Sequence, residues 1–328
     1  MHRDIDLVIP WVDGGDEAWL EEKSCVTGTA PDGGAVRFRD WDNLHYLFRG
    51  VETFLPFVRK VHLVTWGHLP PWLNTDCEKL HVVNHRDYIP AEYLPTFNSN
   101  TIELNFHRID GLAEQFICAN DDMFFLQPLT ADFFFKNGVP VDTCAEEAHA
   151  FISGPIDHII SNNLAIVNKH FSKRETVRRH RRLWYTPKAG KSFLKNLYMM
   201  PFAHFTGFFD PHIPLTYSKH TFEELWQAEP DALDSTCRHR IRSTDDINHW
   251  LCRYWQFVTG NFVPDGTTRG RFFSIGRDDA AIADAILHRR YPMICLNDDD
   301  PDLDFEAAKT QIRQLFEQIL PNKSAFEK

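Results

Sequence analysis

An apolar run near the amino end, Asp6-Leu7-Val8-Ile9-Pro10-Trp11-Val12, breaks into the turn Asp13-Gly14-Gly15-Asp16. A short apolar run that is bounded by turn residues is typical of a buried strand. Asp13 and Gly14 then follow the carboxyl end of that strand directly. The stretch therefore predicts a buried strand with acidic residues at its carboxyl end.

Similar apolar runs alternate with segments of helical spacing along the chain. We expect further strands at residues 61–65, 80–83, 115–119 and 293–296, and helices at residues 42–58, 101–112 and 302–320. Short strands that alternate with helices favour an α/β fold with an open, mostly parallel sheet. Ligands of such sheets bind at the carboxyl ends of the strands. Asp13 and the segment Asn120-Asp121-Asp122 are expected at that edge.

The region from about residue 155 to 260 is helical and basic in pattern and shows no clear strand. We interpret it as a helical insertion packed over the carboxyl edge of the sheet. The predicted organisation is an α/β core at residues 1–150, the insertion at 151–260 and a return to the core at 261–328. These three parts are expected to form one compact catalytic unit.

Composition excludes several classes of protein. The 328 residues carry a net charge of −11, which disfavours general binding of nucleic acid. No apolar run is long enough to span a bilayer, and the first residues lack the apolar core of a signal peptide. The seven cysteines form no CxxC pair, and Cys118 and Cys295 lie within apolar runs. We therefore expect a reducing compartment, the cytoplasm, with peripheral association at the inner membrane face left open.

Positive charge is concentrated between Lys169 and Lys195. This segment holds ten Lys and Arg residues against the single acid Glu175, a local charge of +9 that leaves −20 for the rest. One interpretation is a solvated helix face. The other is a docking surface for an anionic partner, either a lipid head group or a phosphate-bearing polymer.

Two acidic motifs follow predicted strands. Asn120-Asp121-Asp122 ends one strand, and Asn297-Asp298 repeats the arrangement after another. Adjacent carboxylates at a strand end suit a hard cation such as Mg²⁺, or alternatively Mn²⁺, which takes oxygen ligands and bridges to phosphates. Acidic pairs also end strands simply as turn residues. The repetition favours a metal site built from Asp121, Asp122, Asn297 and Asp298.

A second group of residues suits proton transfer and phosphate binding. His212 precedes Ile213-Pro214, and a histidine can take a proton from an attacking hydroxyl. Arg242 can hold a phosphate with two hydrogen bonds. The alternative is structural: Asp245 and Asp246 cap the following helix, and Arg242 makes a surface ion pair.

Two further motifs are open to both a functional and a structural interpretation. Arg37-Phe38-Arg39-Asp40 can contact a nucleotide or form a salt bridge at a helix start. The segment from Asn98-Ser99 to Arg108 can cap a helix or bind phosphate at its N-terminus. No GxxxxGK[ST], HExxH or GxSxG motif is present, which disfavours P-loop kinases, zincins and common serine hydrolases.

Taken in order, these motifs resemble the four conserved blocks of the Stealth family of sugar-1-phosphate transferases. The four blocks correspond here to Ile5–Gly14, to Arg37 through about Phe135, to His212-Ile213-Pro214 through Arg242–Asn248, and to Cys295-Leu296-Asn297-Asp298. The second block includes Val64-Thr65-Trp66-Gly67, Leu94-Pro95-Thr96-Phe97-Asn98-Ser99 and His107-Arg108-Ile109-Asp110-Gly111-Leu112. The similarity covers most of the chain and is loose between about residues 151 and 209.

The family includes bacterial capsule polymerases and the catalytic subunit of the animal N-acetylglucosamine-1-phosphotransferase. The resemblance implies a Rossmann-like, GT-A-like fold for nucleotide sugars and dependence on Mg²⁺. It further implies transfer of a hexose-1-phosphate from a UDP-sugar to a hydroxyl of a saccharide or polysaccharide acceptor, free or lipid-linked, with release of UMP. The spacer modules and membrane anchors of the animal enzyme do not occur in this sequence, which points to the compact bacterial type in capsule or exopolysaccharide synthesis.

The resemblance also assigns roles to residues of this sequence. His212 is the expected general base, with Asp121 or Asp122 as the competing one, and Arg242 is expected to hold the transferred phosphate. Asp121 and Asp122, with Asn297 and Asp298, would hold the metal ion. Asp13, Gly14, Arg39, Ser99 and Arg108 are expected to bind the nucleotide sugar.

Two rival functions remain at this stage. A metal-dependent glycosyltransferase has a similar acidic motif and releases UDP instead of UMP. A non-catalytic module that binds nucleotide sugars or polysaccharide would need no base. The sequence does not identify the sugar, the acceptor hydroxyl, the oligomeric state or the role of the basic segment.

Overall fold

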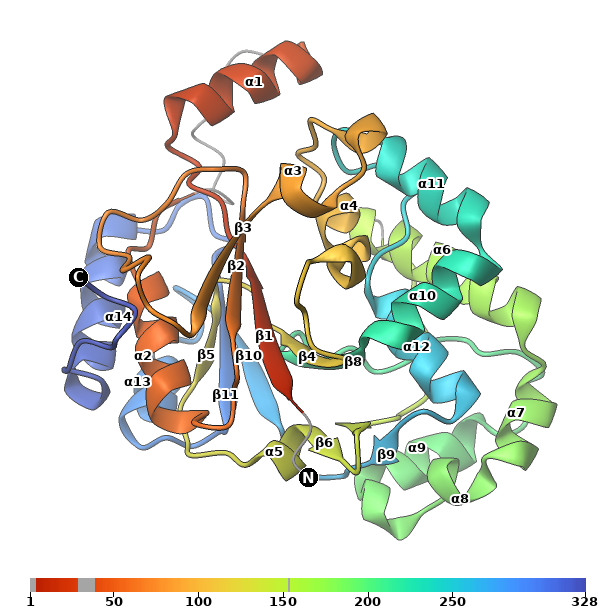
Figure 1. The fold of residues 1–328 in the computed structure, drawn as a ribbon. Helices are drawn as coiled ribbons and strands as arrows, with labels where there is room; N and C mark the ends of the chain where they lie inside the picture. Colours follow the sequence, from red (N-terminus) through yellow and green to blue (C-terminus); the bar gives the residue numbers. More distant parts are fainter. Residues whose placement is uncertain (1–3, 29–38, 153) are drawn as a thin grey trace.

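The computed structural model describes residues 4–28, 39–152 and 154–328 (Figure 1). Five apolar runs pair into a central sheet with the strand order β3-β2-β1-β4-β8. Its strands are β3 (Leu80–Asn84), β2 (Val61–Thr65), β1 (Ile5–Pro10), β4 (Gln115–Cys118) and β8 (Leu215–Ser218). The first four are parallel, and β8 runs antiparallel to β4. The predicted α/β fold with a mostly parallel sheet is thus confirmed, and the order β3-β2-β1-β4 is compatible with a Rossmann-like fold.

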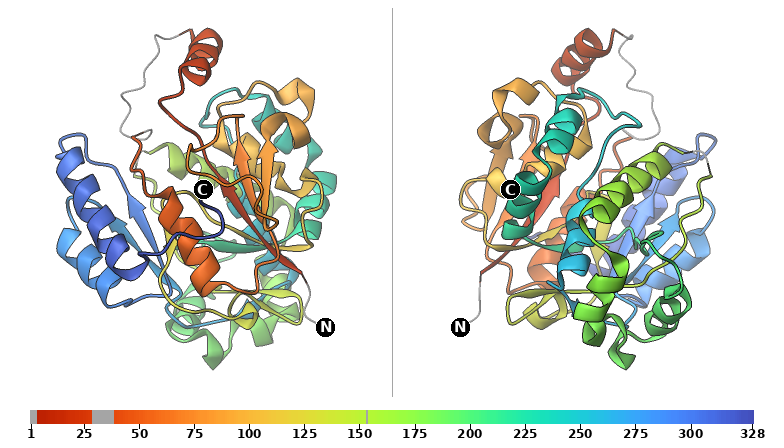
Figure 2. Two further views of the ribbon diagram at one scale, coloured as in Figure 1. Left: turned by 60° about the vertical axis from the view of Figure 1, so that its left-hand side comes forward. Right: turned by 90° about the vertical axis from the view of Figure 1, so that its right-hand side faces the viewer.

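The two faces of the central sheet are buried in two separate apolar cores. Along β1, Leu7 and Ile9 enter one core and Val8 enters the other, because successive side chains of a strand point to opposite faces. The first core contains side chains of α2 (Leu44–Phe54), α13 (Asp279–Leu287) and α14 (Phe305–Ile319). Helices α6 (Pro155–His170), α10 (Lys219–Ala228) and α12 (Trp250–Thr259) contribute to the second core, on the other side of the sheet (Figures 1 and 2).

Two small sheets flank the central one. One has the order β10-β11-β5, with β10 (Gly270–Ser274), β11 (Met293–Asn297) and β5 (Met123–Phe125). The other has the order β6-β7-β9, with β6 (Phe135–Lys136), β7 (Val139–Asp142) and β9 (Val263–Pro264). The strand expected at residues 293–296 is therefore present, but it pairs antiparallel with β5 outside the central sheet.

The remaining helices are short. They are α1 (Glu17–Thr27), α3 (His85–Tyr88), α4 (Ser99–Leu104), α5 (Ala131–Phe134), α7 (Lys173–Arg179), α8 (Arg181–Trp184), α9 (Lys191–Met199) and α11 (Pro230–Arg238). The 3₁₀ turns in the described part of the chain are η2 (Ala91–Tyr93), η3 (Phe106–Arg108) and η4 (Pro187–Ala189). No helix among the described residues combines the length and apolar character that crossing a bilayer requires.

The expectation that residues 155–260 hold no strand is wrong, because β8 lies within them. All four residues of β8 are buried at the edge of the central sheet. Only Leu215 and Tyr217 in this strand are apolar, and they alternate with Thr216 and Ser218. Such a short alternating run gives a weak signal in a sequence.

The helical segment that precedes β8 begins and ends at one place. Glu146 forms a β-bridge with Phe208, and the amide of Glu147 donates to the carbonyl of Gly207 at 3.1 Å. The chain therefore leaves the sheets after β7, builds α6 to α9, and returns beside its own point of departure.

Candidate active site

The site begins with the turn between β4 and β5. The amide of Met123 donates to the carbonyl of Asn120 at 3.1 Å and closes the reversal, in which Asp121 and Asp122 are half-buried. Burial and the adjacent charge of Asp122 raise the pKa of Asp121 to about 7. Burial also raises the pKa of Asp122, and the charge of His212 opposes that shift. Two crowded carboxylates of this kind are stabilised by a nearby cation.

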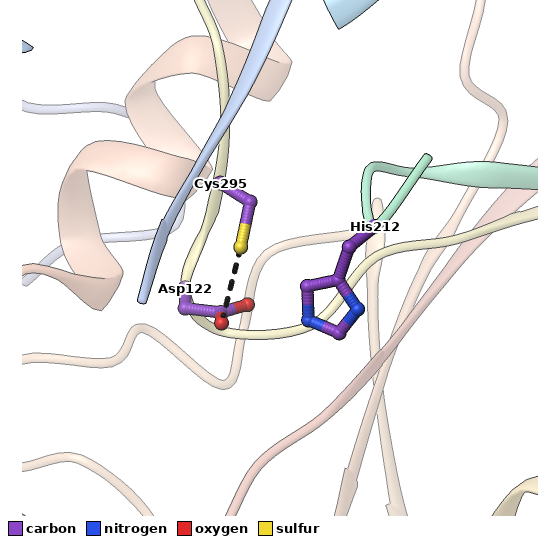
Figure 3. A group of neighbouring side chains, drawn as sticks. All are labelled: Asp122, His212 and Cys295. Atoms are coloured by element: carbon purple, nitrogen blue, oxygen red, sulfur yellow. Dashed lines mark hydrogen bonds between the residues drawn. The ribbon is translucent and has the colours of Figure 1, made fainter. Parts of the chain in front are cut away.

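The end of β11 lies against this turn. The amide of Leu296 donates to the carbonyl of Asp122 at 2.9 Å, and the thiol of Cys295 donates to Asp122 Oδ2 at 3.3 Å (Figure 3). Antiparallel pairing of β11 with β5 places Cys295 opposite Met123. The two acidic strand ends, Asn120-Asp121-Asp122 and Asn297-Asp298, are therefore brought together.

His212 reaches the same place from the loop before β8. Leu215 pairs with Cys118, so the residues that precede β8 lie beyond the carboxyl end of β4. A ring nitrogen of His212, a carboxylate oxygen of Asp122 and the sulfur of Cys295 lie within 4.8 Å of one another (Figure 3). A potential base thus stands beside a carboxylate at the point between β1 and β4 where the strand order reverses, which is where such sheets bind ligands.

The donor atoms here suit a hard divalent cation. Asp122 Oδ1 is buried and has no hydrogen-bond partner among the described residues. Burial and the charge of Asp122 raise the pKa of the Cys295 thiol, so the sulfur keeps its proton and serves as a hydrogen-bond donor rather than a ligand. Carboxylate oxygens of Asp121 and Asp122 remain, and these are the ligands that Mg²⁺ and Mn²⁺ prefer.

Arg242 lies over the start of α4. Its Nε and Nη2 atoms donate to the hydroxyl of Ser99 at 3.0 and 2.5 Å. The guanidinium group is accessible from solvent, because Arg242 is exposed. Two of the predicted phosphate-binding residues are therefore in contact with each other.

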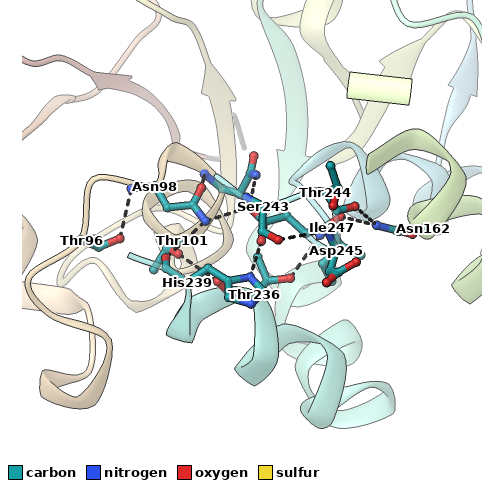
Figure 4. Close-up of polar contacts among 12 residues, drawn as sticks. Thr96, Asn98, Thr101, Asn162, Thr236, His239, Ser243, Thr244, Asp245 and Ile247 are labelled. Atoms are coloured by element: carbon teal, nitrogen blue, oxygen red, sulfur yellow. Dashed lines mark hydrogen bonds and ion pairs between the residues drawn. The ribbon is translucent and has the colours of Figure 1, made fainter. Parts of the chain in front are cut away.

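A buried carboxylate holds the loop of Arg242 in place. Asp246 Oδ2 accepts hydrogen bonds from the side-chain amides of Asn98 and Asn100, both at 2.8 Å, and from the amide of Ser243 at 3.0 Å. Its Oδ1 lies 2.7 Å from His239 Nδ1. Figure 4 shows this network joining the segment of Asn98 to the segment of Ser243. Asp246 positions Arg242 relative to Ser99.

The helix-cap interpretation of Asp245 and Asp246 is wrong. Helix α12 begins at Trp250, and the amide of Trp250 donates to Asn248 Oδ1 at 3.1 Å. The N-cap residue is His249, and Asn248, one residue before it, supplies the side-chain acceptor at this helix start.

His249 links the two halves of the site and was not singled out from the sequence. Its pKa is lowered to about 3 by burial first, and then by the charges of His212 and Arg242. It is therefore a neutral group within electrostatic reach of both. Its Nδ1 lies 2.9 Å from the hydroxyl of Tyr217, which fixes the ring. A histidine that directly precedes a helix has no sequence pattern that would indicate such a position between two site residues.

Arg253 supports the loop that carries His212, and the sequence analysis did not identify it either. The side chain is fully buried and forms a two-point ion pair with Asp142, at 2.7 and 2.9 Å. Its Nη1 donates to the carbonyl of Phe209 and to Asp210 Oδ1, at 2.9 and 2.8 Å. The segment that leads into His212 is thereby fixed to β7.

Arg39 and Asp298, which were expected to bind the nucleotide and the metal, contact each other. Arg39 Nη1 lies 3.5 Å from Asp298 Oδ1, and Trp41 Nε1 donates to Asp298 Oδ2 at 3.2 Å. Burial raises the pKa of Asp298, and the charge of Arg39 opposes that shift. Arg37 and Phe38 lie outside the described residues.

Asp13 and Gly14 follow β1 at the same edge as the acidic turn. The amide of Asp13 donates to His68 Nε2 at 2.7 Å, and Asp13 Oδ1 accepts from the amide of Gly15 at 2.9 Å. Burial lowers the pKa of His68, so it accepts this bond as a neutral ring. Arg108, in contrast, is exposed on η3 and lies over the indole of Trp226, 4.8 Å from the ring centroid.

A cavity of about 170 Å³ opens at the ends of β2 and β3. It is lined by Glu22, Trp66, Asn84, His85, Arg86, Leu94, Pro95 and Thr96. Its place at the carboxyl edge is the one at which ligands of parallel sheets bind.

Comparison with known proteins shows which parts of the chain resemble a known family. Three conserved regions of the Stealth proteins match the chain: region 1 at residues 3–28, region 2 at 37–142 and region 4 at 284–328. The acidic turn lies in the second range and Cys295 in the third. His212 and Arg242 lie outside all three.

Several bacterial proteins are similar along the whole chain. The capsular polysaccharide phosphotransferase WcwK of Streptococcus pneumoniae is 36% identical over 99% of this chain and 98% of its own length. The exopolysaccharide phosphotransferase cps2G of Lactiplantibacillus plantarum is 37% identical over 99% and 96%. The receptor polysaccharide phosphotransferase WefC of Streptococcus gordonii is 35% identical over the full length of both.

Fold, site and relatives together define an α/β enzyme of the phosphotransferase class. Within that class, the chain belongs to the Stealth family.

Proposed function

We propose that the enzyme transfers a hexose-1-phosphate from a UDP-sugar to a hydroxyl of a saccharide acceptor, with release of UMP. The phosphodiester that forms would belong to a capsular or exopolysaccharide, and an N-acetylhexosamine is the proposed sugar. The proposal rests on one observation above all, the placement of His212 beside the Asp121-Asp122 turn at the switch point of the sheet. The printed names of the relatives support a polysaccharide product. A GT-A-like form of the Rossmann-like fold is part of the same proposal.

The proposed reaction is a displacement at phosphorus. The acceptor oxygen bonds to the phosphorus that carries the sugar, and the bond from that phosphorus to the UMP oxygen breaks. The proton of the acceptor hydroxyl goes to the imidazole of His212, with a carboxylate of the acidic turn as the competing base. The bond between the sugar C1 and its oxygen is never broken, so the anomeric configuration is retained.

Positioning and charge neutralisation supply most of the catalysis in such a reaction. Arg242 is proposed to hold the transferred phosphate, and its present partner, the Ser99 hydroxyl, orients the guanidinium toward α4. The fixed loops of Arg242 and His212, held by Asp246 and Arg253 respectively, support this assignment because a positioned group loses little entropy on binding.

A divalent cation is the proposed cofactor, Mg²⁺ before Mn²⁺. Asp121 and Asp122 would hold it, and Asn297 and Asp298 lie at the adjoining strand end. Bound there, the ion would neutralise charge on the diphosphate of the donor. The unpartnered Asp122 Oδ1 supports this proposal. We place the reaction in the cytoplasm, in keeping with seven cysteines that are all free thiols.

Analysis of the nucleotide product tests the proposal. The protein is incubated with Mg²⁺, a panel of UDP-sugars and capsular oligosaccharide, and UMP and UDP are separated by chromatography. We expect UMP together with a new phosphodiester signal in ³¹P NMR, and much slower formation of both with His212→Ala. Formation of UDP would instead identify a glycosyltransferase.

Measurement of donor binding distinguishes the enzyme from a non-catalytic module that only binds the nucleotide sugar. Calorimetric titration of the same UDP-sugars, with and without EDTA, detects a binding module that turns nothing over. Binding without any product across the acceptor panel would contradict the proposed activity.

A further inference from the structure

Helix α9 turns three of its large apolar side chains toward solvent. Leu194 is 64% exposed and Tyr198 is 77% exposed, and Leu197 is exposed beside them. The buried positions of this helix are Ser192, Asn196 and Met199. Surface helices normally place their apolar stripe against the core, and α9 departs from this rule because Leu194, Leu197 and Tyr198 face outward while two polar residues are buried.

The exposure does not come from a loosely held helix. Asn196 is fully buried, and its Nδ2 donates to the carbonyls of Cys144 and Trp184 at 2.9 and 3.0 Å. Its Oδ1 accepts from the amide of Glu146 at 2.7 Å. These three bonds fix the rotation of α9, so its outer face cannot turn inward.

The apolar surface continues beyond the helix. The ammonium of Lys195 lies 5.1 Å from the ring centroid of Phe209, which brings that exposed ring beside α9. The α9 surface is defined here as Leu194, Leu197, Tyr198, Met200, Phe202 and Phe209, all exposed. A connected set of large apolar side chains on a surface marks a binding face.

Basic side chains are exposed on α9 itself and on the elements next to it in sequence. Seven exposed residues on α7, α8, η4 and the start of α9 have no carboxylate within ion-pair distance among the described residues: Arg174, Arg178, Arg179, Arg181, Arg182, Lys188 and Lys191. Helices α7, α8 and α9 gather at one corner of the molecule (Figures 1 and 2). The corner is therefore positive and apolar on a chain that is acidic elsewhere.

We propose that the α9 surface docks on a membrane that contains anionic lipids. Apolar side chains amid Lys and Arg match the bilayer interface, where rings and aliphatic groups enter the acyl boundary and cations meet lipid phosphates. A soluble polyanion would pair with the cations but leave the apolar residues in water. A second copy of this face would bring two positive surfaces together.

The α9 surface includes a residue of the loop that carries the candidate base, His212. Phe209 belongs to the α9 surface and precedes His212 by three residues, on the segment that Arg253 fixes. The docked face and the site thus share one loop. This inference does not depend on which sugar or nucleotide the enzyme uses.

Vesicle sedimentation tests the proposal with the full chain. Vesicles of phosphatidylcholine alone are compared with vesicles that contain roughly 30% phosphatidylglycerol, at low salt and at about 0.5 M NaCl. The variants are Leu194→Ser/Tyr198→Ser and Arg178→Glu/Arg179→Glu. Leu287→Ser and Arg277→Glu, exposed on the α13 side of the molecule, serve as matched controls.

We expect binding to the anionic vesicles alone, its loss at high salt, and partition coefficients about tenfold lower in each double variant but unchanged in the controls. Turnover on a soluble acceptor should stay unchanged in all four. In the wild type, hydrogen exchange at residues 190–203 should slow when vesicles are added, a result that needs no variant.

Absence of vesicle binding would overturn the proposal, as would equal binding by the double variants. So would a result in which the double variants instead lose affinity for soluble anionic polysaccharide. Loss of a concentration-dependent dimer, seen by size-exclusion chromatography, would assign the face to a second copy and also overturn it.

Discussion

The thiol of Cys295 donates a hydrogen bond to Asp122 Oδ2 across 3.3 Å, from a strand that lies 173 positions further along the chain. This bond lowers the pKa of a carboxyl group that burial otherwise raises. Cys295 therefore orients Asp122 and helps to keep it ionised.

Removal of that donor should weaken the proposed activation by Mg²⁺. With Cys295→Ala both Asp122 oxygens lack a partner, and we expect the Mg²⁺ concentration for half-maximal turnover to rise roughly tenfold. Cys295→Ser keeps a donor and should stay near the wild type. The measurement is turnover as a function of Mg²⁺ concentration for the three proteins. Coincident curves for the alanine variant and the wild type would contradict the role given to the thiol.

Loss of the candidate base should slow the chemical step. We expect His212→Ala to lower turnover by about 10²- to 10⁴-fold with little change in the unfolding midpoint. His220→Ala, at an exposed histidine on α10, is the control. Near-normal turnover in a folded His212→Ala enzyme would assign the proton transfer to the acidic turn instead.

Arg242 should act on both donor binding and rate. Arg242→Ala removes the proposed charged partner of the transferred phosphate, and kcat/KM should fall about 10²- to 10³-fold, with a higher donor KM and a lower kcat. Ser99→Ala removes only the hydroxyl that orients the guanidinium, so its loss should stay below about tenfold. Steady-state kinetics with varied donor separate the two, and equal losses would show that Ser99 contacts the donor itself.

Asp246 should matter far more for folding than its neighbour. Asp246→Asn places an amide N–H opposite three N–H donors in a buried network and should lower the free energy of unfolding by roughly 2–4 kcal/mol. Asp245→Asn, at an exposed position, should stay within about 0.5 kcal/mol. Urea denaturation of both gives the comparison. Similar values for the two would contradict the network as the anchor of the Arg242 loop.

Stability should depend on acid pH through Asp6. Burial raises the pKa of this carboxyl, but hydrogen bonds from His62, Arg59 and the Ala113 amide outweigh it and lower the pKa to about 2. A depressed pKa means that the stabilisation is fully present above the unfolded value near 4 and is lost as pH falls toward 2. Its size is about 2 kcal/mol.

The variant Asp6→Asn isolates this group. Denaturation midpoints at pH 7 should drop, and the remaining fall between pH 4 and pH 2 should become shallower than in the wild type. Parallel pH curves for the two proteins would mean that other carboxyls cause the acid sensitivity.

The parts of the fold set by local sequence were predictable. Strand β2 lies at the predicted residues 61–65, because a run this short and rich in β-branched residues is too short for a helix and favours a buried strand. The helix predicted at residues 101–112 instead ends at Leu104. There the side chain of Asn105 donates to the carbonyl of Thr101 at 2.8 Å, which ends the helix in a way that apolar spacing does not show.

The site was predictable as a set of residues but not as a set of contacts. Asp122 was expected at the sheet edge and His212 within the insertion packed over it, whereas Cys295 was noted as a cysteine within an apolar run and in the fourth conserved block, with no expected contact to Asp122. Its contact with Asp122 depends on antiparallel pairing of β11 with β5, and such long-range pairing has no local signal. The ion pair of Arg39 with Asp298 likewise joins residues far apart in the chain, so the local sequence does not indicate it.

The meeting of Glu146 with Phe208 has a consequence for the history of this enzyme. Because the helical excursion is closed at its base, its length and outer surface can change from one descendant to another while Asp122 and His212 keep their distance. One ion pair limits that freedom. Lys173 Nζ, within the helical segment, lies 2.6 Å from Oε2 of the buried Glu146 at its base. Lineages can therefore acquire new surroundings for an unaltered reaction, provided that this cation is retained.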